Sequence, residues 1–134
     1  MYIGGYISSM NVRPYAPSDY ETIRQWWVGH HNTEFLPEHF LPKVGGIVDG
    51  LASWLLYDSG QSVYLLNWPV SNPEAGHESY GKAFSAIVDY FKELIPNKSI
   101  MTAYPQGKRI SNILKEKDFN MVNEYNKEMI WGRS

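Results

Sequence analysis

The sequence predicts an α+β (mixed α/β) domain around one central sheet, and three observations carry that prediction. Apolar runs between 44 and 70 are separated by Asp49-Gly50 and Ser59-Gly60, dipeptides that are typical of hairpin turns. From Gly81 to Ile95 the apolar residues fall on one stripe of a helix. Strand and helix patterns then alternate, which indicates helical crossovers packed on the faces of a mixed, mostly antiparallel sheet.

The N-terminal part is expected to contain a short strand and two helices. The strand spans 10–15 and ends beside a proline. Ser18 and Glu21 have the spacing of a capping box, so the first helix should begin there and end near Gly29. A second short helix is expected over 34–41.

Three strands should follow, over 44–48, 51–57 and 63–70. The third is apolar almost throughout, which favours a central strand covered on both faces. It contains Pro69, which has no N–H for a ladder hydrogen bond, so pairing should be lost or the strand should bulge at that point.

The C-terminal part is expected to alternate between helices and strands. Its predicted elements are a loop over 76–80, helices over 81–95 and 108–116, and strands over 99–104, 119–125 and 128–131, the last two joined through Asn126-Lys127.

The composition limits the class of protein. A chain of 134 residues suits one domain, which we expect at 10–134 behind an N-terminal extension at 1–9. A net charge of −2 argues against a broad nucleic-acid-binding surface. There are 0 cysteines, no apolar run long enough to cross a membrane and no signal peptide, so a cytoplasmic location is expected. A monomer and a homodimer both remain open.

The start of the helix after the central strand carries a motif. The register gives Glu78-Ser79-Tyr80-Gly81-Lys82-Ala83, where Gly81 and Ala83 match a pattern of Arg or Gln, two residues, Gly, one residue, and Gly or Ala. The pattern is the signature of a known family. Residues 108–119 resemble a helix near the C-terminus of the same family, with Asp118 in place of the usual glycine. Over 10–133 the chain resembles the Gcn5-related N-acetyltransferase (GNAT) superfamily, including small bacteriophage-encoded or degenerate members.

The resemblance implies acetyl-CoA as cofactor and direct attack of an amine on its thioester. Backbone N–H groups at a helix start and the helix dipole suit a pyrophosphate. The implied cofactor-binding residues lie on the central strand, at the helix start and in the late helix: Leu66, Asn67, Trp68, Ser79, Tyr80, Gly81, Lys82, Ala83 and Asn112. A backbone N–H of Asn67 or Trp68 would polarise the thioester carbonyl.

The same resemblance implies an acid for the leaving thiolate. Many members place a tyrosine in the late helix, but the matched residue here is Leu114, and Tyr104 and Ser111 are the candidates to replace it. A coenzyme A thiolate is a fair leaving group at neutral pH, so transfer does not require the acid.

A base for the amine is sought in the connection between the first two helices. Glu34, or a histidine beside it, could serve as the base. The cluster has no recognised zinc-ligand spacing, so no metal site is predicted. Its members are His30, His31, Glu34, Glu38 and His39.

Two functions and a third, purely structural interpretation, an α+β domain without a cofactor, remain open at this point. One is an N-acetyltransferase that acts on a small-molecule or protein amine. The other is a catalytically degenerate binding module for coenzyme A or a protein partner, which Glu78 and Leu114 favour.

Overall fold

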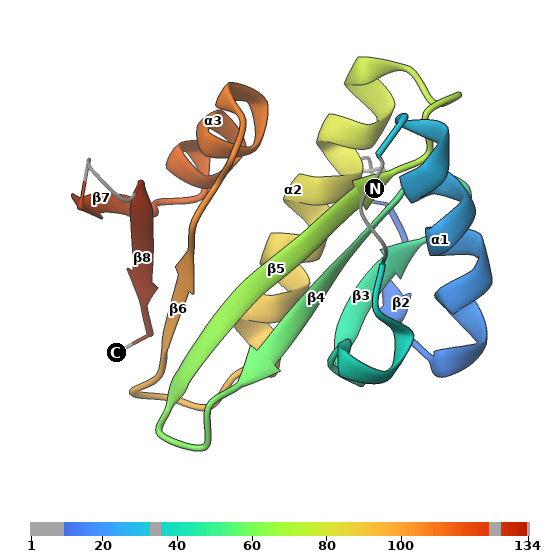
Figure 1. Ribbon diagram of the computed structural model, residues 1–134. Coiled ribbons are helices and arrows are strands. Elements are labelled where there is room, and N and C mark those ends of the chain that lie inside the picture. The colour runs from blue at the N-terminus through green and yellow to red at the C-terminus, as the bar shows by residue number, and fades with distance from the viewer. Residues whose placement is uncertain (1–9, 33–35, 124–126, 134) are drawn as a thin grey trace, which may run out of the picture.

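The computed structural model describes residues 10–32, 36–123 and 127–133. Across these residues, seven strands form one mixed sheet in the order β2-β3-β4-β5-β6-β8-β7 (Figure 1). All neighbouring strands pair antiparallel except β5 and β6, which run parallel. The strand bounds are Arg13–Pro14 (β2), Gly45–Val48 (β3), Ala52–Asp58 (β4), Val63–Ser71 (β5), Ile100–Ala103 (β6), Asn120–Asn123 (β7) and Glu128–Gly132 (β8).

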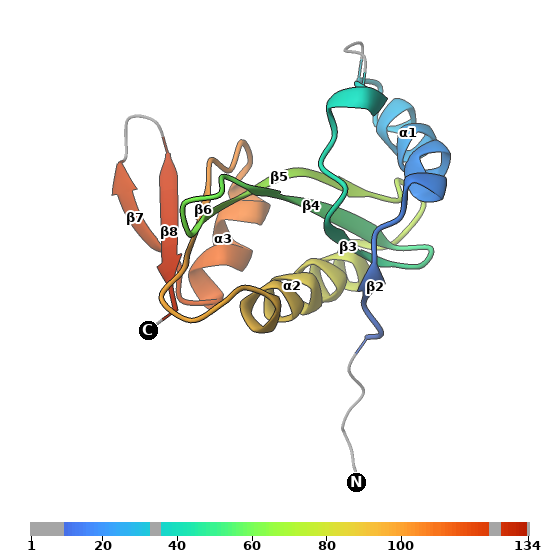
Figure 2. The same ribbon diagram turned by 90° about the horizontal axis from the view of Figure 1, so that it is seen from below.

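Helices cover both faces of this sheet. They are α1 (Tyr20–Gly29), α2 (His77–Leu94) and α3 (Lys108–Glu116), with short 3₁₀ turns at Pro17–Asp19 (η1) and Glu38–Phe40 (η2). Figure 2 shows α2 and α3 on one face and α1 on the opposite face. The predicted α+β class with helices on both faces is therefore confirmed. No helix in the described part of the chain is long and apolar enough to cross a membrane.

The core has two parts because successive side chains of a strand point to opposite faces. In β4, Trp54 and Leu56 pack on the side of α2, whereas Leu55 packs on the side of α1. The apolar stripe of α2 contributes Ile87 and Phe91, both 0% exposed. Burying one such side chain stabilises the fold by about 1.5–3 kcal/mol, so the predicted stripe does determine which face of α2 meets the sheet.

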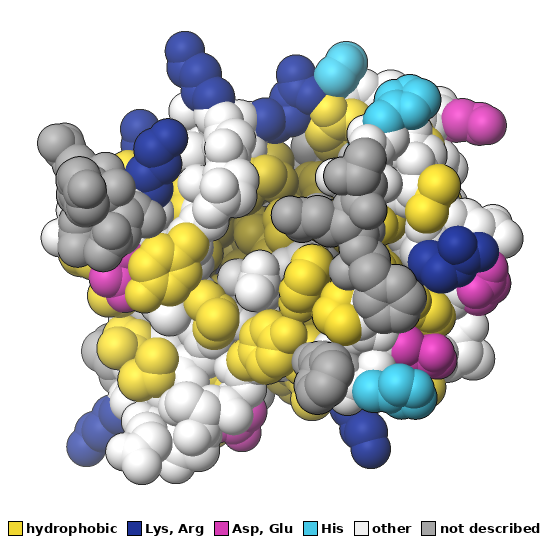
Figure 3. All heavy atoms as spheres, viewed as in Figure 1, with side chains coloured by type: hydrophobic (Ala, Val, Ile, Leu, Met, Phe, Trp, Pro, Cys, Tyr) yellow, Lys and Arg dark blue, Asp and Glu magenta, His cyan; other side chains and the backbone are white. Residues whose placement is uncertain are grey.

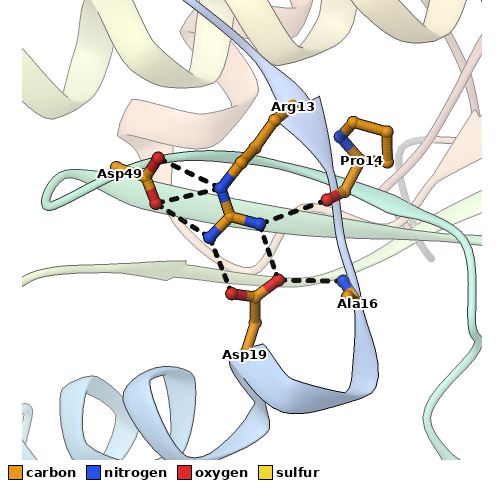
Figure 4. A network of polar contacts seen from close by, with 5 residues as sticks. All are labelled: Arg13, Pro14, Ala16, Asp19 and Asp49. Atoms are coloured by element: carbon orange, nitrogen blue, oxygen red, sulfur yellow. Dashed lines mark hydrogen bonds and ion pairs between the residues drawn. The ribbon is translucent and has the colours of Figure 1, made fainter.

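The N-terminal elements differ from the prediction. The first strand is only Arg13–Pro14, and the proposed Ser18 cap is wrong because α1 begins after the turn η1. Asp19 organises this corner instead: its carboxylate accepts a hydrogen bond from Ala16 N (2.8 Å) and two from the Arg13 guanidinium (2.7 and 2.9 Å). Figure 4 shows that the same guanidinium also reaches Asp49, in the turn between β3 and β4, at 2.8 Å.

The central strand β5 has the irregularity predicted from Pro69. Ser53 pairs with Val70 and Leu55 pairs with Asn67, so Trp68 and Pro69 together lie opposite Trp54. This is a β-bulge. Trp68 has a φ of 58°, a left-handed conformation that is uncommon for a bulky residue. Coverage of both faces is only partial, because Val63, Tyr64 and Leu65 are half-buried.

The start of α2 is a second correction. Residues 77–80 form the first turn of the helix rather than a loop, since α2 begins at His77 with Gly76 before it.

The C-terminal end of α3 has the expected backbone shape, although Asp118 stands in place of the usual glycine. Asp118 has a φ of 70°, the left-handed conformation that glycine favours after a helix.

The remaining predicted elements are observed with small shifts at their ends. The predicted helix at 108–116 coincides with α3, and the strand at 99–104 contains β6. The predicted helix over 34–41 is reduced to the turn η2 in its described part. Residues 1–9, Glu34 and Asn126 lie outside the described residues.

Candidate functional site

The parallel strands β5 and β6 separate at one end of the sheet. Val63–Leu66 pair with Ile100–Ala103, and no pairing continues beyond Leu66 and Ala103. A cavity of about 290 Å³ lies at this point, lined by Trp54, Asn67, Pro69, Tyr104, Gln106 and Ile110 among others. Figure 3 shows a hollow floored by hydrophobic side chains where the two strands diverge, with Lys, Arg and His side chains along its upper rim.

A larger groove runs between α2 and α3. Its volume is about 700 Å³, and its wall includes Gly81, Lys82, Arg109 and Asn112. A third cavity, of about 250 Å³, shares Arg109 with this groove and shares Pro69 and Ile110 with the cavity between the strands. The three hollows are therefore neighbours, and they follow one another from the start of α2 to the separated strands.

An arginine-centred cluster lies where the groove meets the smaller cavity. His77 Nδ1 lies 2.5 Å from Tyr80 Oη, and Arg109 Nη1 donates to both atoms. The guanidinium also lies over the Tyr80 ring, 5.4 Å from its centroid. Across the described residues Arg109 has no carboxylate partner, so its charge is available to an anionic ligand.

The carboxylate of Glu78 does not oppose this cluster directly. It forms an ion pair with Lys82 at 3.2 Å, one helical turn along α2. Both side chains are exposed, so the pair contributes little to stability. Glu78 stands where the family motif has a basic residue. Its pairing with Lys82 nevertheless reduces the repulsion between the Glu78 carboxylate and a bound anion.

Because α2 begins at His77, its free backbone donors differ from those predicted. The first N–H groups of a helix lack intrahelical acceptors, and these belong to His77, Glu78 and Ser79. Tyr80 N already donates to Gly76 O at 3.1 Å. Ser79 and Tyr80 are half-buried, whereas Ala83 is 0% exposed and belongs to the core. Ala83 therefore has no surface to offer a cofactor, and we leave it out of the proposed site.

Gly81 lies in the second turn of α2 and faces the groove. A Cβ atom built at Gly81 meets nothing within 4 Å. The groove is therefore open at this position, and a side chain placed there would occupy space that a ligand could use.

The bulge in β5 decides which backbone donor faces the cleft. Ser59 N donates to Val63 O of β5, whereas Leu56 N donates to Val44 O on the other side of β4. Backbone N–H groups alternate in direction along a strand, so every second residue of β5, counted from Val63, faces β4. The N–H of Asn67 is therefore directed toward β4. The N–H of Trp68 is directed the other way and donates to Asn67 Oδ1 at 2.9 Å. Of the two backbone donors predicted, the N–H of Trp68 is thus the one on the cleft side. In this structure its hydrogen bond is made to the side chain of Asn67.

The acid candidates lie in different environments. Leu114 is 0% exposed, whereas Tyr104 is 46% exposed and lines the cavity between the strands. Partial removal of the hydroxyl from water, together with the nearby Glu128, raises the pKa of Tyr104, so the phenol stays protonated at neutral pH. Ser111 Oγ contacts Met129 Sδ at 3.7 Å.

The base candidates are only partly described. Glu34 lies outside the described residues. His30 Nε2 lies 2.8 Å from Ser71 O and 3.2 Å from Ser71 Oγ, and His30 lines the cavity of about 250 Å³. His39 is exposed on η2. Within the part of the chain that the structure describes, no group of three or more metal-ligating side chains is found.

Arg109 is the residue that sequence reasoning missed. A signal was present: α3 begins with Lys108 and Arg109 and has no acid in its first turn. Cations at a helix N-terminus oppose the helix dipole. A locally unfavourable choice of this kind points to a functional position.

The whole fold is similar to solved acetyltransferases. A GNAT-family acetyltransferase from Bacillus anthracis superposes with a TM-score of 0.58 at 15% identity, covering 92% of this chain and 93% of the other. Ard1 from Thermoplasma volcanium gives a TM-score of 0.60 at 11% identity, with 92% and 97% covered. The ribosomal-protein-S5-alanine acetyltransferase from Vibrio fischeri gives 0.57 at 11%, with 99% and 98% covered.

No protein-family model matches the chain, and no curated protein matches it by sequence. The structural similarity nevertheless extends over nearly the whole domain. The chain therefore has the fold of GNAT acetyltransferases, as the sequence predicted.

Proposed function

We propose that this protein is an N-acetyltransferase that binds acetyl-CoA along the path from the start of α2 to the separated strands. One observation supports this most: Arg109, which has no carboxylate partner among the described residues, and the free backbone N–H groups of α2 border a groove that neighbours a mainly apolar cleft. A coenzyme with an anionic nucleotide end and a long uncharged arm matches that sequence of environments.

The anionic end is assigned to the cluster. Arg109 would hold a phosphate by charge-assisted hydrogen bonds, assisted by His77 and by the N–H groups at 77–79. Gly81 leaves the groove open, and Lys82 and Asn112 line it. The uncharged arm is assigned to the cleft that begins just beyond Leu66, at Asn67, where β5 no longer pairs with β6.

The chain's own residues supply the catalytic groups. When bound, acetyl-CoA supplies the acetyl thioester. As the amine forms the new C–N bond and the C–S bond breaks, the N–H of Trp68, released by Asn67 Oδ1, would stabilise the charge on the carbonyl oxygen. Tyr104 would donate its proton to the leaving sulfur, and His30 would accept the amine proton.

The acceptor is proposed as an amine, either small or on a protein. It would enter through the cavity lined by Trp27, His30 and Ser71, which adjoins the cleft. Of the three similar proteins, one has a name that states an acceptor, the alanine of ribosomal protein S5, and the fold alone does not select an acceptor for this chain.

Release of free thiol from acetyl-CoA tests the proposal. A panel of small amines and peptide N-termini should contain acceptors that release thiol at a rate proportional to enzyme concentration. Tyr104→Phe should lower kcat by about tenfold with little change in KM, because the phenol acts on the leaving group. Thiol release that no amine stimulates would contradict the proposed reaction.

A second function is favoured by two specific observations. Leu114 is buried where the family places its acid, and the cleft-side N–H of Trp68 is already occupied. Both suit a protein that binds coenzyme A without transferring the acetyl group. Tight binding of coenzyme A without turnover on any amine would support this function over catalysis.

A further inference from the structure

Trp68 has a left-handed backbone conformation although it is not a glycine. Its φ is 58°, a conformation that is costly for a bulky residue and that persists only where the surrounding structure holds it. Residues of this kind concentrate at functional positions. The backbone N–H of Trp68 is the donor on the cleft side, so the contacts that hold Trp68 also decide where this donor points.

The bulge turns the side chain of Trp68 to the side of α1. Every second side chain of a regular strand points to the same face, so Trp68 would share the side of α2 with Leu66. Leu66 does pack on the side of α2, whereas Trp68 and Val70 pack on the side of α1. The extra residue of the bulge produces this change of face. The place of the Trp68 ring therefore depends on whether the bulge is formed.

Two aromatic residues hold the Trp68 ring in that place. Its indole Nε1 donates a hydrogen bond to Tyr57 Oη on β4 at 2.9 Å. The ring of Trp27, on α1, packs edge-on against it, with centroids 5.7 Å apart. Trp27 also lines the cavity of about 250 Å³, whereas Tyr57 lines neither this cavity nor the groove nor the cleft. Tyr57 can therefore be changed without altering the wall of any of the three hollows.

We propose that Tyr57 is a positioning residue for the reaction. By holding the Trp68 indole it keeps the bulge formed, and so keeps the Trp68 backbone N–H on the cleft side, where it can meet the carbonyl oxygen of a thioester. Tyr57 acts through Trp68 rather than by contact with a ligand. A donor whose direction is already fixed stabilises developing charge without reorganisation of the backbone. This inference rests on the proposed function, because it takes the Trp68 N–H as the donor.

Kinetics of Tyr57→Phe test the positioning role. The change removes only the hydroxyl that accepts the indole hydrogen bond. It should lower kcat about fivefold, the effect of one hydrogen bond, and leave the KM of acetyl-CoA and of the amine nearly unchanged, since the donor acts mainly in the transition state. Tyr64→Phe is the matched control and should react as the wild type does. Tyr64 is a half-buried tyrosine of β5 that packs on the side of α2 and lines none of the three hollows.

A double-mutant cycle tests whether the effect passes through the indole. Trp68→Phe keeps an aromatic ring at the bulge and removes the N–H that donates to Tyr57. Because both changes remove the same hydrogen bond, adding Tyr57→Phe to Trp68→Phe should cause no further loss of kcat. Losses that multiply in the double variant would contradict the coupling.

Infrared spectroscopy supplies a measurement that needs no turnover. The carbonyl band of ¹³C-labelled acetyl-CoA bound to the wild-type protein should lie at lower frequency than that of the free compound, because a hydrogen bond weakens the C=O bond. At saturation, the band should return partly toward the free frequency in Tyr57→Phe and stay unchanged in Tyr64→Phe. A band that Tyr57→Phe does not move contradicts the positioning role, whatever its effect on kcat.

The outcomes separate this inference from the proposed function. If amines are acetylated but Tyr57→Phe matches the wild type in both measurements, the role of Tyr57 is wrong and the proposed function stands. If the carbonyl band responds to Tyr57→Phe but no amine is acetylated, the direction of the donor is confirmed and the proposed reaction fails. If acetyl-CoA does not bind the wild-type protein, both fail.

Discussion

Two arginine-centred clusters in this molecule have opposite character. Arg13 is held by two carboxylates, those of Asp19 and Asp49, so its charge is fully compensated. Within the described residues Arg109 donates hydrogen bonds to His77 and Tyr80 and forms no ion pair with a carboxylate. The first cluster joins β2, η1 and the turn after β3 (Figure 4), whereas the second borders an open groove.

The difference shows how the same side chain serves stability in one place and binding in another. A compensated arginine stabilises the elements that carry its partners, and the partners' pKa values record the interaction: the hydrogen bond from Arg13 lowers the pKa of Asp19 and of Asp49. An arginine without a carboxylate keeps its charge available to a ligand. The comparison therefore predicts that changes at the two sites affect different measurements.

The largest expected effect is on binding, at Arg109. Arg109→Ala should weaken coenzyme A binding by about 10- to 100-fold, since hydrogen bonds to charged groups are worth about 1.5–3 kcal/mol. The free energy of unfolding should change little, because the side chain is exposed. Calorimetry and denaturant unfolding measure the two quantities. Arg24→Ala on α1 is the matched control, an exposed arginine paired with Glu21; equal losses of affinity in both variants would contradict the assignment.

The next effect is expected at Gly81. Gly81→Glu should weaken binding about tenfold, because the new carboxylate enters the open groove beside the anion-binding cluster. Gly81→Ala is its control: it should stabilise α2 by about 0.5–1 kcal/mol and leave the affinity nearly unchanged. Coenzyme A binding measured at low salt tests both variants. If Gly81→Glu binds as tightly as Gly81→Ala, the groove is not the phosphate site.

A smaller effect is expected on stability, at Arg13. Arg13→Ala should lower the free energy of unfolding by about 1 kcal/mol, a value discounted for solvent screening because the Arg13 side chain is 41% exposed. Coenzyme A affinity should not change. Urea unfolding followed by tryptophan fluorescence provides the measurement. A variant that keeps its stability but loses affinity would reverse the two roles and refute the comparison.

The smallest effect is a change of that stability with pH. The folded-state pKa of Asp19 lies below its ordinary value of 3.8. The stabilisation from the Arg13–Asp19 pair is therefore complete at a pH above that value, and it is lost as the pH falls through the folded pKa. The stability difference between wild type and Arg13→Ala should therefore be constant near neutrality and shrink in acid below about pH 4. Unfolding curves collected from pH 7 to pH 3 test this, and a difference that grows in acid would be inconsistent with the pairing.

The fold was more predictable from sequence than the site, for physical reasons. The stripe on α2, the turn residue Gly50 and the bulge at Pro69 are local patterns that the packing merely completes. The cluster of His77 and Arg109 joins the first turns of two helices far apart in the chain, and only the tertiary fold brings them together.

The start of α2 differs from its prediction for a local reason. The loop expected at 76–80 followed from placing the helix start at Gly81, whereas α2 begins at His77. Ala83 was named from the motif match, and its complete burial in the core is a property of the tertiary fold. Asp118 departs from the family pattern in residue type, yet it adopts the left-handed backbone that the usual glycine would supply. An aspartate at this position therefore has the same type of backbone conformation that a glycine would adopt there.

The central claim is that the groove between α2 and α3 and the cleft between β5 and β6 form one coenzyme A site. Titration calorimetry of the wild-type protein with acetyl-CoA tests it most directly. The predicted result is one molecule bound per chain with micromolar affinity, which Arg109→Ala weakens and Arg13→Ala does not. An absence of measurable binding to a folded wild-type protein would contradict the claim.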